Sequence, residues 1–151
     1  KGEYISYTHA DMQTDPKDIL KAYDIIKIQA NPQKAYIKGN RKKRAIFDQI
    51  FTIGMSIFET LYLKTILWDI NAQPNMFHNS FFKSLHNIPK DFSLDLYFLY
   101  KAKKRSMNII RFNVLFPPRI YGVSSWNDGF KSKLKFIKRT LDFTFKLKKE
   151  L

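Results

Sequence analysis

The chain has no cysteine among its 151 residues, so disulfide bonds and thiolate metal sites are excluded. This absence suits a reducing compartment. Acidic residues are also scarce: 13 Asp and Glu stand against 27 Lys and Arg, which gives a formal net charge of +14. A surface this basic attracts polyanions, namely nucleic acid, anionic lipid headgroups or phosphorylated substrates. The charge by itself does not choose among these three.

No leader sequence is recognisable at the start of the chain. It begins with Lys1-Gly2-Glu3 rather than with a basic start and an apolar run, and the missing Met suggests that other sequence precedes it. The most apolar stretch, about 45–68, is long enough to span a bilayer but carries charged and polar residues, namely Asp48, Gln49, Glu59 and Lys64. We therefore predict an amphipathic helix that lies near a membrane surface.

The composition is sufficient for a packed core, with 44% hydrophobic and 16% aromatic residues. The pattern predicts strands at about 4–8, 35–38 and 108–116, and helices at about 16–27, 45–68, 80–86, 93–103 and 130–151. Ser93 is the expected cap of the helix over 93–103. This order predicts the βαβ units of a parallel sheet. Because two or three strands make a poor sheet, we expect the chain to be the second half of a domain.

The end of the first predicted strand is the strongest candidate for a ligand site. Pro16 fits the first position of the following helix, so Asp11 and Gln13 fall in the loop between the two elements. In open α/β sheets, ligands bind at such loops. An acidic and polar loop in this place indicates a site for a metal and a phosphate. The pattern also fits a turn in which Asp11 only caps the backbone, and both interpretations stay open.

Two further loops carry side chains suited to phosphate. Arg41 follows Gly39, where the missing side chain lets the backbone approach a ligand and a guanidinium can hold phosphate through two hydrogen bonds. Arg119 precedes the hydroxyls of Ser124 and Ser125, in a loop rich in donors for a diphosphate or an acceptor phosphate. A solvated basic loop is the alternative interpretation for the residues around Arg41.

Six short motifs occur along the chain in an order that resembles the C-terminal part of a family 2 inverting glycosyltransferase of the GT-A fold. It resembles in particular the polyprenyl-phosphate sugar transferases, such as dolichyl-phosphate mannose synthase. The motifs are Ala10-Asp11-Met12-Gln13 with Asp15-Pro16, Lys38-Gly39-Asn40-Arg41, Asp69-Ile70-Asn71-Ala72-Gln73-Pro74 with Met76-Phe77, Phe92-Ser93-Leu94-Asp95, Arg111-Phe112-Asn113-Val114, and Arg119-Ile120-Tyr121-Gly122-Val123-Ser124-Ser125-Trp126. The resemblance implies an α/β, Rossmann-like domain over 1–129 without its N-terminal half, and a basic amphipathic helix over 130–151.

What the resemblance implies is transfer of a sugar, with inversion, from a nucleotide-diphosphate donor. The acceptor is a polyprenyl phosphate or a growing glycan, and Mg²⁺ or Mn²⁺ is the cofactor. The family's Asp-X-Asp metal motif falls on residues 9–11, so Asp11 matches the second carboxylate and His9 replaces the first. Asp11 and Gln13 offer the oxygen ligands that a hard cation prefers. An imidazole suits Mn²⁺ better than Mg²⁺, so His9 is either a ligand or unused.

The resemblance also assigns residues on the acceptor side. It brings Asp69, Asn71 and Gln73 to a turn near the acceptor. An acidic residue close to Asp95 acts as general base in the wider inverting glycosyltransferases, where it removes a proton from a sugar hydroxyl. A phosphate acceptor is already anionic and needs no base. A carboxylate in the first turn of a helix is also stabilised by the helix dipole, so a structural role for Asp95 stays open.

The basic residues then have a specific explanation. Those at 42–44 and in the C-terminal helix would hold the protein against anionic lipid, as a peripheral cytoplasmic protein at the inner face of the membrane. A nucleic-acid-binding module is the rival class, but no nucleic acid is expected because no helix-turn-helix, zinc finger or RNA-binding signature occurs. A noncatalytic protein that kept the fold is a third class, since His9 replaces a metal carboxylate. The segment alone is expected to bind nucleotide sugar weakly and to turn nothing over.

Overall fold

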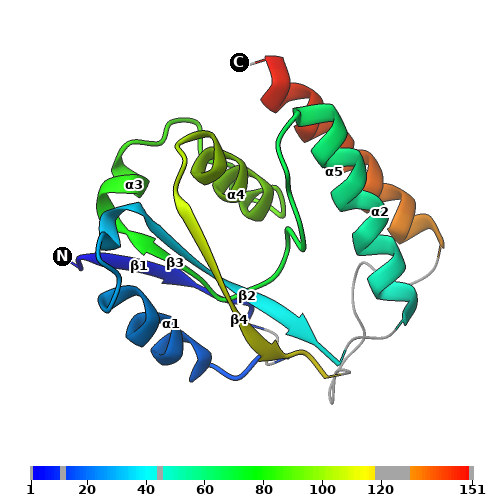
Figure 1. Cartoon of the computed structure of the whole chain (residues 1–151). Helices are drawn as coiled ribbons and strands as arrows, with labels where there is room; N and C mark the ends of the chain where they lie inside the picture. The colour runs from blue at the N-terminus through cyan, green and yellow to red at the C-terminus, as the bar shows by residue number, and fades with distance from the viewer. Residues whose placement is uncertain (1, 11–12, 44–45, 118–129, 150–151) are drawn as a thin grey trace.

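The structure is a computed structural model that describes residues 2–10, 13–43, 46–117 and 130–149, without the side chains of 47, 48, 130–133 and 136. The elements are, in chain order, β1 (Tyr4–Tyr7), α1 (Asp18–Lys27), the 3₁₀ turn η1 (Pro32–Lys34), β2 (Ala35–Lys42), α2 (Ile46–Leu63), β3 (Asn75–His78), α3 (Asn79–Lys83), α4 (Leu94–Lys104), β4 (Asn108–Leu115) and α5 (Phe130–Lys149). They form an α/β fold (Figure 1).

The sheet is mixed, with the strand order β1-β3-β2-β4. Strand β3 pairs antiparallel with both β1 and β2, while β2 and β4 pair in parallel. The prediction of a parallel βαβ sheet was therefore wrong, because it missed β3, a strand of only four residues directly after a turn. The strands β1, β2 and β4 still run in one direction, and their carboxyl ends point to the same edge of the sheet (Figure 1).

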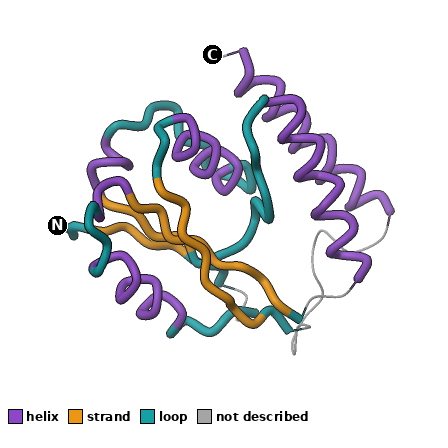
Figure 2. Tube along the Cα trace, in the orientation of Figure 1, coloured by secondary structure: helices purple, strands orange, loops and turns teal. Residues whose placement is uncertain are grey.

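Helices cover the two faces of the sheet unequally. On one face, α1 buries Ala22 and Ile26 against Ile37 and Met76. The other face packs on α4, and beyond α4 stands the pair α2 and α5, so this side of the molecule has two helical layers (Figure 2). The strand alternation dictates this division, because successive side chains of a strand point to opposite faces.

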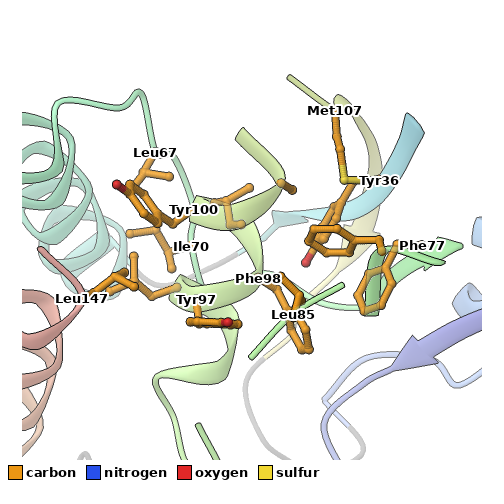
Figure 3. Close-up of a cluster of buried hydrophobic side chains, with 14 of the residues drawn as sticks. Tyr36, Leu67, Ile70, Phe77, Leu85, Tyr97, Phe98, Tyr100, Met107 and Leu147 are labelled. Carbon is orange, nitrogen blue, oxygen red and sulfur yellow. The ribbon is translucent and has the colours of Figure 1, made fainter. Parts of the chain in front are cut away.

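The larger core is centred on α4. Tyr36 and Phe77 extend from the sheet toward one side of α4, with their rings stacked at 5.4 Å between centroids. On the other side of α4, Leu67 and Ile70 from the loop after α2 meet Leu147 of α5 (Figure 3). All five are in one cluster of buried residues, and burial of each side chain contributes about 1.5–3 kcal/mol. Helix α4 therefore joins the sheet to the α2 and α5 pair.

The predicted helices and strands occur, with shifted ends. Helix α2 ends at Leu63 rather than near 68, because Lys64 has a left-handed backbone with φ 50°. Ser93 is not a side-chain cap of α4. The carboxylate of Asp91 instead accepts a hydrogen bond from the backbone N–H of Ser93 at 3.0 Å. None of the described helices has the length and apolarity to cross a bilayer.

Candidate functional site

A row of polar side chains crosses the sheet close to the carboxyl end of β1. The strand register pairs Tyr7 with Asn75, Asn75 with Lys38, and Lys38 with Arg111, one residue from each strand. Paired residues point to the same face, and Tyr7 packs against the cluster around α4. One pleat further back, the same face carries the apolar Phe77 and its neighbours. The face therefore changes from apolar to polar just before the edge where the parallel strands end.

Asp95, in the first turn of α4, meets this row. Its Oδ1 accepts hydrogen bonds from the hydroxyl of Tyr7 at 2.9 Å and from Nδ2 of Asn75 at 3.1 Å. Its Oδ2 accepts a third from Nε2 of Gln73 at 3.0 Å. The predicted position in the first turn of a helix is confirmed, and Asp95 is only 6% exposed. Both oxygens are therefore already engaged by the protein, which makes Asp95 a positioning group in this arrangement.

Lys38 is fully buried beside Asp95. Its Nζ donates to the backbone oxygen of Ala72 at 2.7 Å and to Oδ1 of Asn75 at 3.0 Å. The hydroxyl of Tyr36 donates to the same Oδ1 at 3.2 Å. Burial lowers the pKa of Lys38 to about 7, although the negative charge of Asp95 acts in the opposite direction. The site therefore contains an amine that changes charge near neutral pH.

Arg41 and Asp69 form a buried ion pair at the end of β2. The Nε of Arg41 donates to Oδ1 of Asp69 at 2.9 Å, Nη2 also binds this oxygen, and the backbone N–H of Arg41 lies 3.3 Å from Oδ2. Burial raises the pKa of Asp69, but the hydrogen bonds and charge of Arg41 outweigh it, and the pKa lies below 3.8. The phosphate-binding guanidinium expected at Arg41 is thus occupied by a carboxylate of the same chain.

Gly39 lets the backbone approach, but the approaching group is the protein itself. Its N–H donates to the oxygen of Pro74 at 2.9 Å. A Cβ at Gly39 would lie 2.2 Å from the backbone oxygen of Gln73. Gln73 is 6% exposed, and its Oε1 has no hydrogen-bond partner within the described ranges. Gly39 therefore allows the turn of residues 69–74 to close against β2 and to present Gln73 to Asp95.

The loop after β1 lies against the end of β4. Nε2 of Gln13 donates to the backbone oxygen of Pro117 at 3.3 Å. His9 is partly buried in the same loop, and Asn71 is partly buried in the turn before β3. The predicted residues Asp11, Arg119, Ser124 and Ser125 lie outside the described residues. Within the described part of the chain, no three His, Asp or Glu side chains gather as metal ligands.

The structure brings four predicted residues to the site, in two pairs: Arg41 with Asp69, and Gln73 with Asp95. Sequence reasoning missed the polar row, whose members are Tyr7, Lys38, Asn75 and Arg111. One signal was available, because Lys38 follows three apolar residues in a strand that is buried on both faces. The guanidinium of Arg111 donates hydrogen bonds to the backbone oxygen of Gly39 at 3.2 Å and to the backbone oxygen of Trp68. These bonds hold the side chain in place.

Comparison of the chain with family models, with curated proteins and with solved structures found no match.

Proposed function

We propose that this chain is the C-terminal part of a GT-A glycosyltransferase that transfers a sugar, with inversion, from a nucleotide-diphosphate donor. One observation carries the proposal. Residues 9–10 and 13 follow β1 and Pro117 follows β4, and these are the described parts of two segments expected to bind ligand. The strands β1 and β4 run in the same direction as β2, where Arg41 holds Asp69. Ligands in open α/β sheets bind outside the carboxyl ends of the strands. The hydrogen bond from Gln13 to Pro117 supports this convergence.

The buried charged residues of the site have structural roles in this proposal, and the reacting groups come from the donor and the acceptor. The Arg41 and Asp69 pair and the contacts of Asp95 hold the turn of residues 69–74 in place, beside the edge where donor and acceptor would meet. Because both oxygens of Asp95 are engaged, an acceptor that needs no general base fits best. A polyprenyl phosphate meets this condition, since its phosphate oxygen is already anionic, and a glycan hydroxyl is the second choice.

In the proposed reaction, an oxygen of the acceptor phosphate attacks the anomeric carbon of the donor sugar. The bond from that carbon to the donor diphosphate breaks, and the nucleoside diphosphate leaves with the electron pair. Positive charge at the edge of the sheet would stabilise this leaving group. Asp11 would hold Mg²⁺ or Mn²⁺, which would supply positive charge to balance the diphosphate of the donor.

The test is a transfer assay on the complete protein that contains this chain. UDP- and GDP-sugars are supplied with Mn²⁺ or Mg²⁺ and polyprenyl phosphate, and the product is separated from free sugar. Asp11→Ala is expected to abolish the metal-dependent turnover. The matched control is Asp24→Ala, which removes an exposed carboxylate that pairs with Lys27 on α1 and should leave turnover unchanged.

Two outcomes would contradict the proposal. The absence of turnover with every donor, in a protein that still binds vesicles or oligonucleotides, would indicate a noncatalytic or binding module. Robust turnover by the isolated 151 residues would contradict the expectation that the donor-binding half of the domain lies outside this chain. The isolated chain is expected to bind nucleotide sugar only weakly.

A further inference from the structure

Helix α2 exposes a row of large aliphatic side chains. We call this row the isoleucine stripe. It consists of Ile46 (72% exposed), Ile50 (61%), Ile53 (38%), Ile57 (51%) and Leu61 (72%). On a helix with about 100° per residue, all five fall within about 80° of one another. The stripe runs the length of α2, about 27 Å. Just beyond the helix, Ile66 and Trp68 are also exposed, at 76 and 49%.

The exposed side of α2 carries no acidic residue among the side chains that the structure describes. Its other exposed residues within the helix are Gln49 and Gly54. The described acidic residue of this helix, Glu59, faces α5 and is 0% exposed. Both of its carboxyl oxygens lie within 2.9 Å of the hydroxyl of Thr144 on α5. The fold thus turns the carboxyl group of Glu59 inward, and the described side chains on the exposed side of α2 carry no negative charge.

Cations border the stripe. Exposed lysines precede α2 and follow its last turn, at Lys42, Lys43 and Lys64. Helix α5 packs on the side of α2 that carries Glu59, with the rings of Tyr62 and Phe145 5.1 Å apart, and Nζ of its Lys148 lies 4.1 Å from the centre of the Tyr62 ring. An apolar stripe bordered by lysines matches an anionic lipid surface, where the aliphatic groups enter the acyl boundary and the ammonium groups meet the headgroups.

We infer that the isoleucine stripe of α2, with its flanking lysines, docks onto the surface of an anionic lipid bilayer. A nucleic acid would use the charge but would leave the aliphatic side chains in water. A protein partner would cover the stripe but would not require a border of one charge sign. Helix α2 begins four residues after Lys42, the last residue of β2, so docking would bring the carboxyl edge of the sheet to the lipid surface.

The test measures binding of the purified chain to vesicles of phosphatidylcholine with phosphatidylglycerol, by co-sedimentation. The stripe variant carries Ile50→Glu and Ile57→Glu. The matched control carries Leu20→Glu and Ile28→Glu, which replace residues at and beside α1 that are 65 and 75% exposed. Because all four positions are exposed, circular dichroism should show the same helix content for each protein. We expect binding at least about tenfold weaker for the stripe variant and nearly unchanged for the control.

Binding should also weaken when phosphatidylcholine is the only lipid, because the lysines then lose their anionic partners. Three results would overturn the inference. They are undiminished vesicle binding by the stripe variant, equal loss in the control, or no vesicle binding by the wild type. In the last case, a wild-type dimer that the stripe substitutions dissociate would show that a second copy covers the stripe. The assay contains no sugar donor, so a failure of the transferase proposal leaves its outcome unaffected.

Discussion

Glu59 offers the cleanest test of how α2 and α5 pack. Its side chain is fully buried between the two helices and lies beside Thr144. The single hydroxyl hydrogen of Thr144 serves one acceptor at a time, and its oxygen also lies 2.8 Å from the backbone oxygen of Thr140. Burial raises the pKa of Glu59 from 4.5 to about 7, and the hydrogen bond from Thr144 opposes this only in part. Below about pH 7, the protonated form of Glu59 is therefore favoured in the folded protein.

Glu59→Gln keeps the shape of the side chain and removes its ionisation. In the wild type, the raised pKa contributes stability that is fully present below pH 4.5 and is lost as the pH rises to about 7. The loss amounts to about 3 kcal/mol. The variant should not show it. Its free energy of unfolding should be near that of the wild type at pH 4.5 and up to about 3 kcal/mol higher at pH 7.5.

The assay is urea unfolding of both proteins at several pH values between 4.5 and 7.5, followed by circular dichroism. The informative quantity is the difference between the two curves, because other titrating groups cancel in it. Asp24→Asn, at an exposed carboxylate of α1, is the control and should run parallel to the wild type. Parallel curves for Glu59→Gln would refute the reasoning, since they would mean that Glu59 ionises in the folded protein as easily as in water.

Two further predictions concern the site. The pKa of Lys38 lies at about 7, below its ordinary 10.5, so the unfolding free energy should rise between pH 7 and 10.5 by at most about 1.4 kcal/mol per pH unit. Lys38→Met should remove this rise in urea unfolding at pH 7, 8 and 9, and an equal slope would contradict the burial of the amine. Gly39→Ala should lower the unfolding free energy by about 1–3 kcal/mol, because its Cβ would overlap the backbone oxygen of Gln73. The control Gly54→Ala, with nothing within 4 Å of the new Cβ, should stabilise α2 by about 0.5–1 kcal/mol, and a similar loss in both variants would refute the contact.

The local elements were predictable because their signals are local. Alternating side chains identified β1, β2 and β4, and apolar spacing identified α1, α2, α4 and α5. The order of elements gave the α/β class. The predicted site residues Asp69, Gln73 and Asp95 are all buried, and Gln73 donates a hydrogen bond to Asp95. Strand β3 was missed, since four residues after a turn carry too little periodicity to be recognised.

The contacts within the site were decided by tertiary structure. Arg41 and Asp69 are 28 residues apart and meet only because the turn of residues 69–74 closes on β2. The inserted strand β3 brings Asn75 between Tyr7 and Lys38, which creates the polar row. The sequence by itself determined the helices, most of the strands and the basic surface, because each follows from neighbouring residues. Strand register decides which polar groups are buried and which partners they contact. Register is fixed only when distant segments pair.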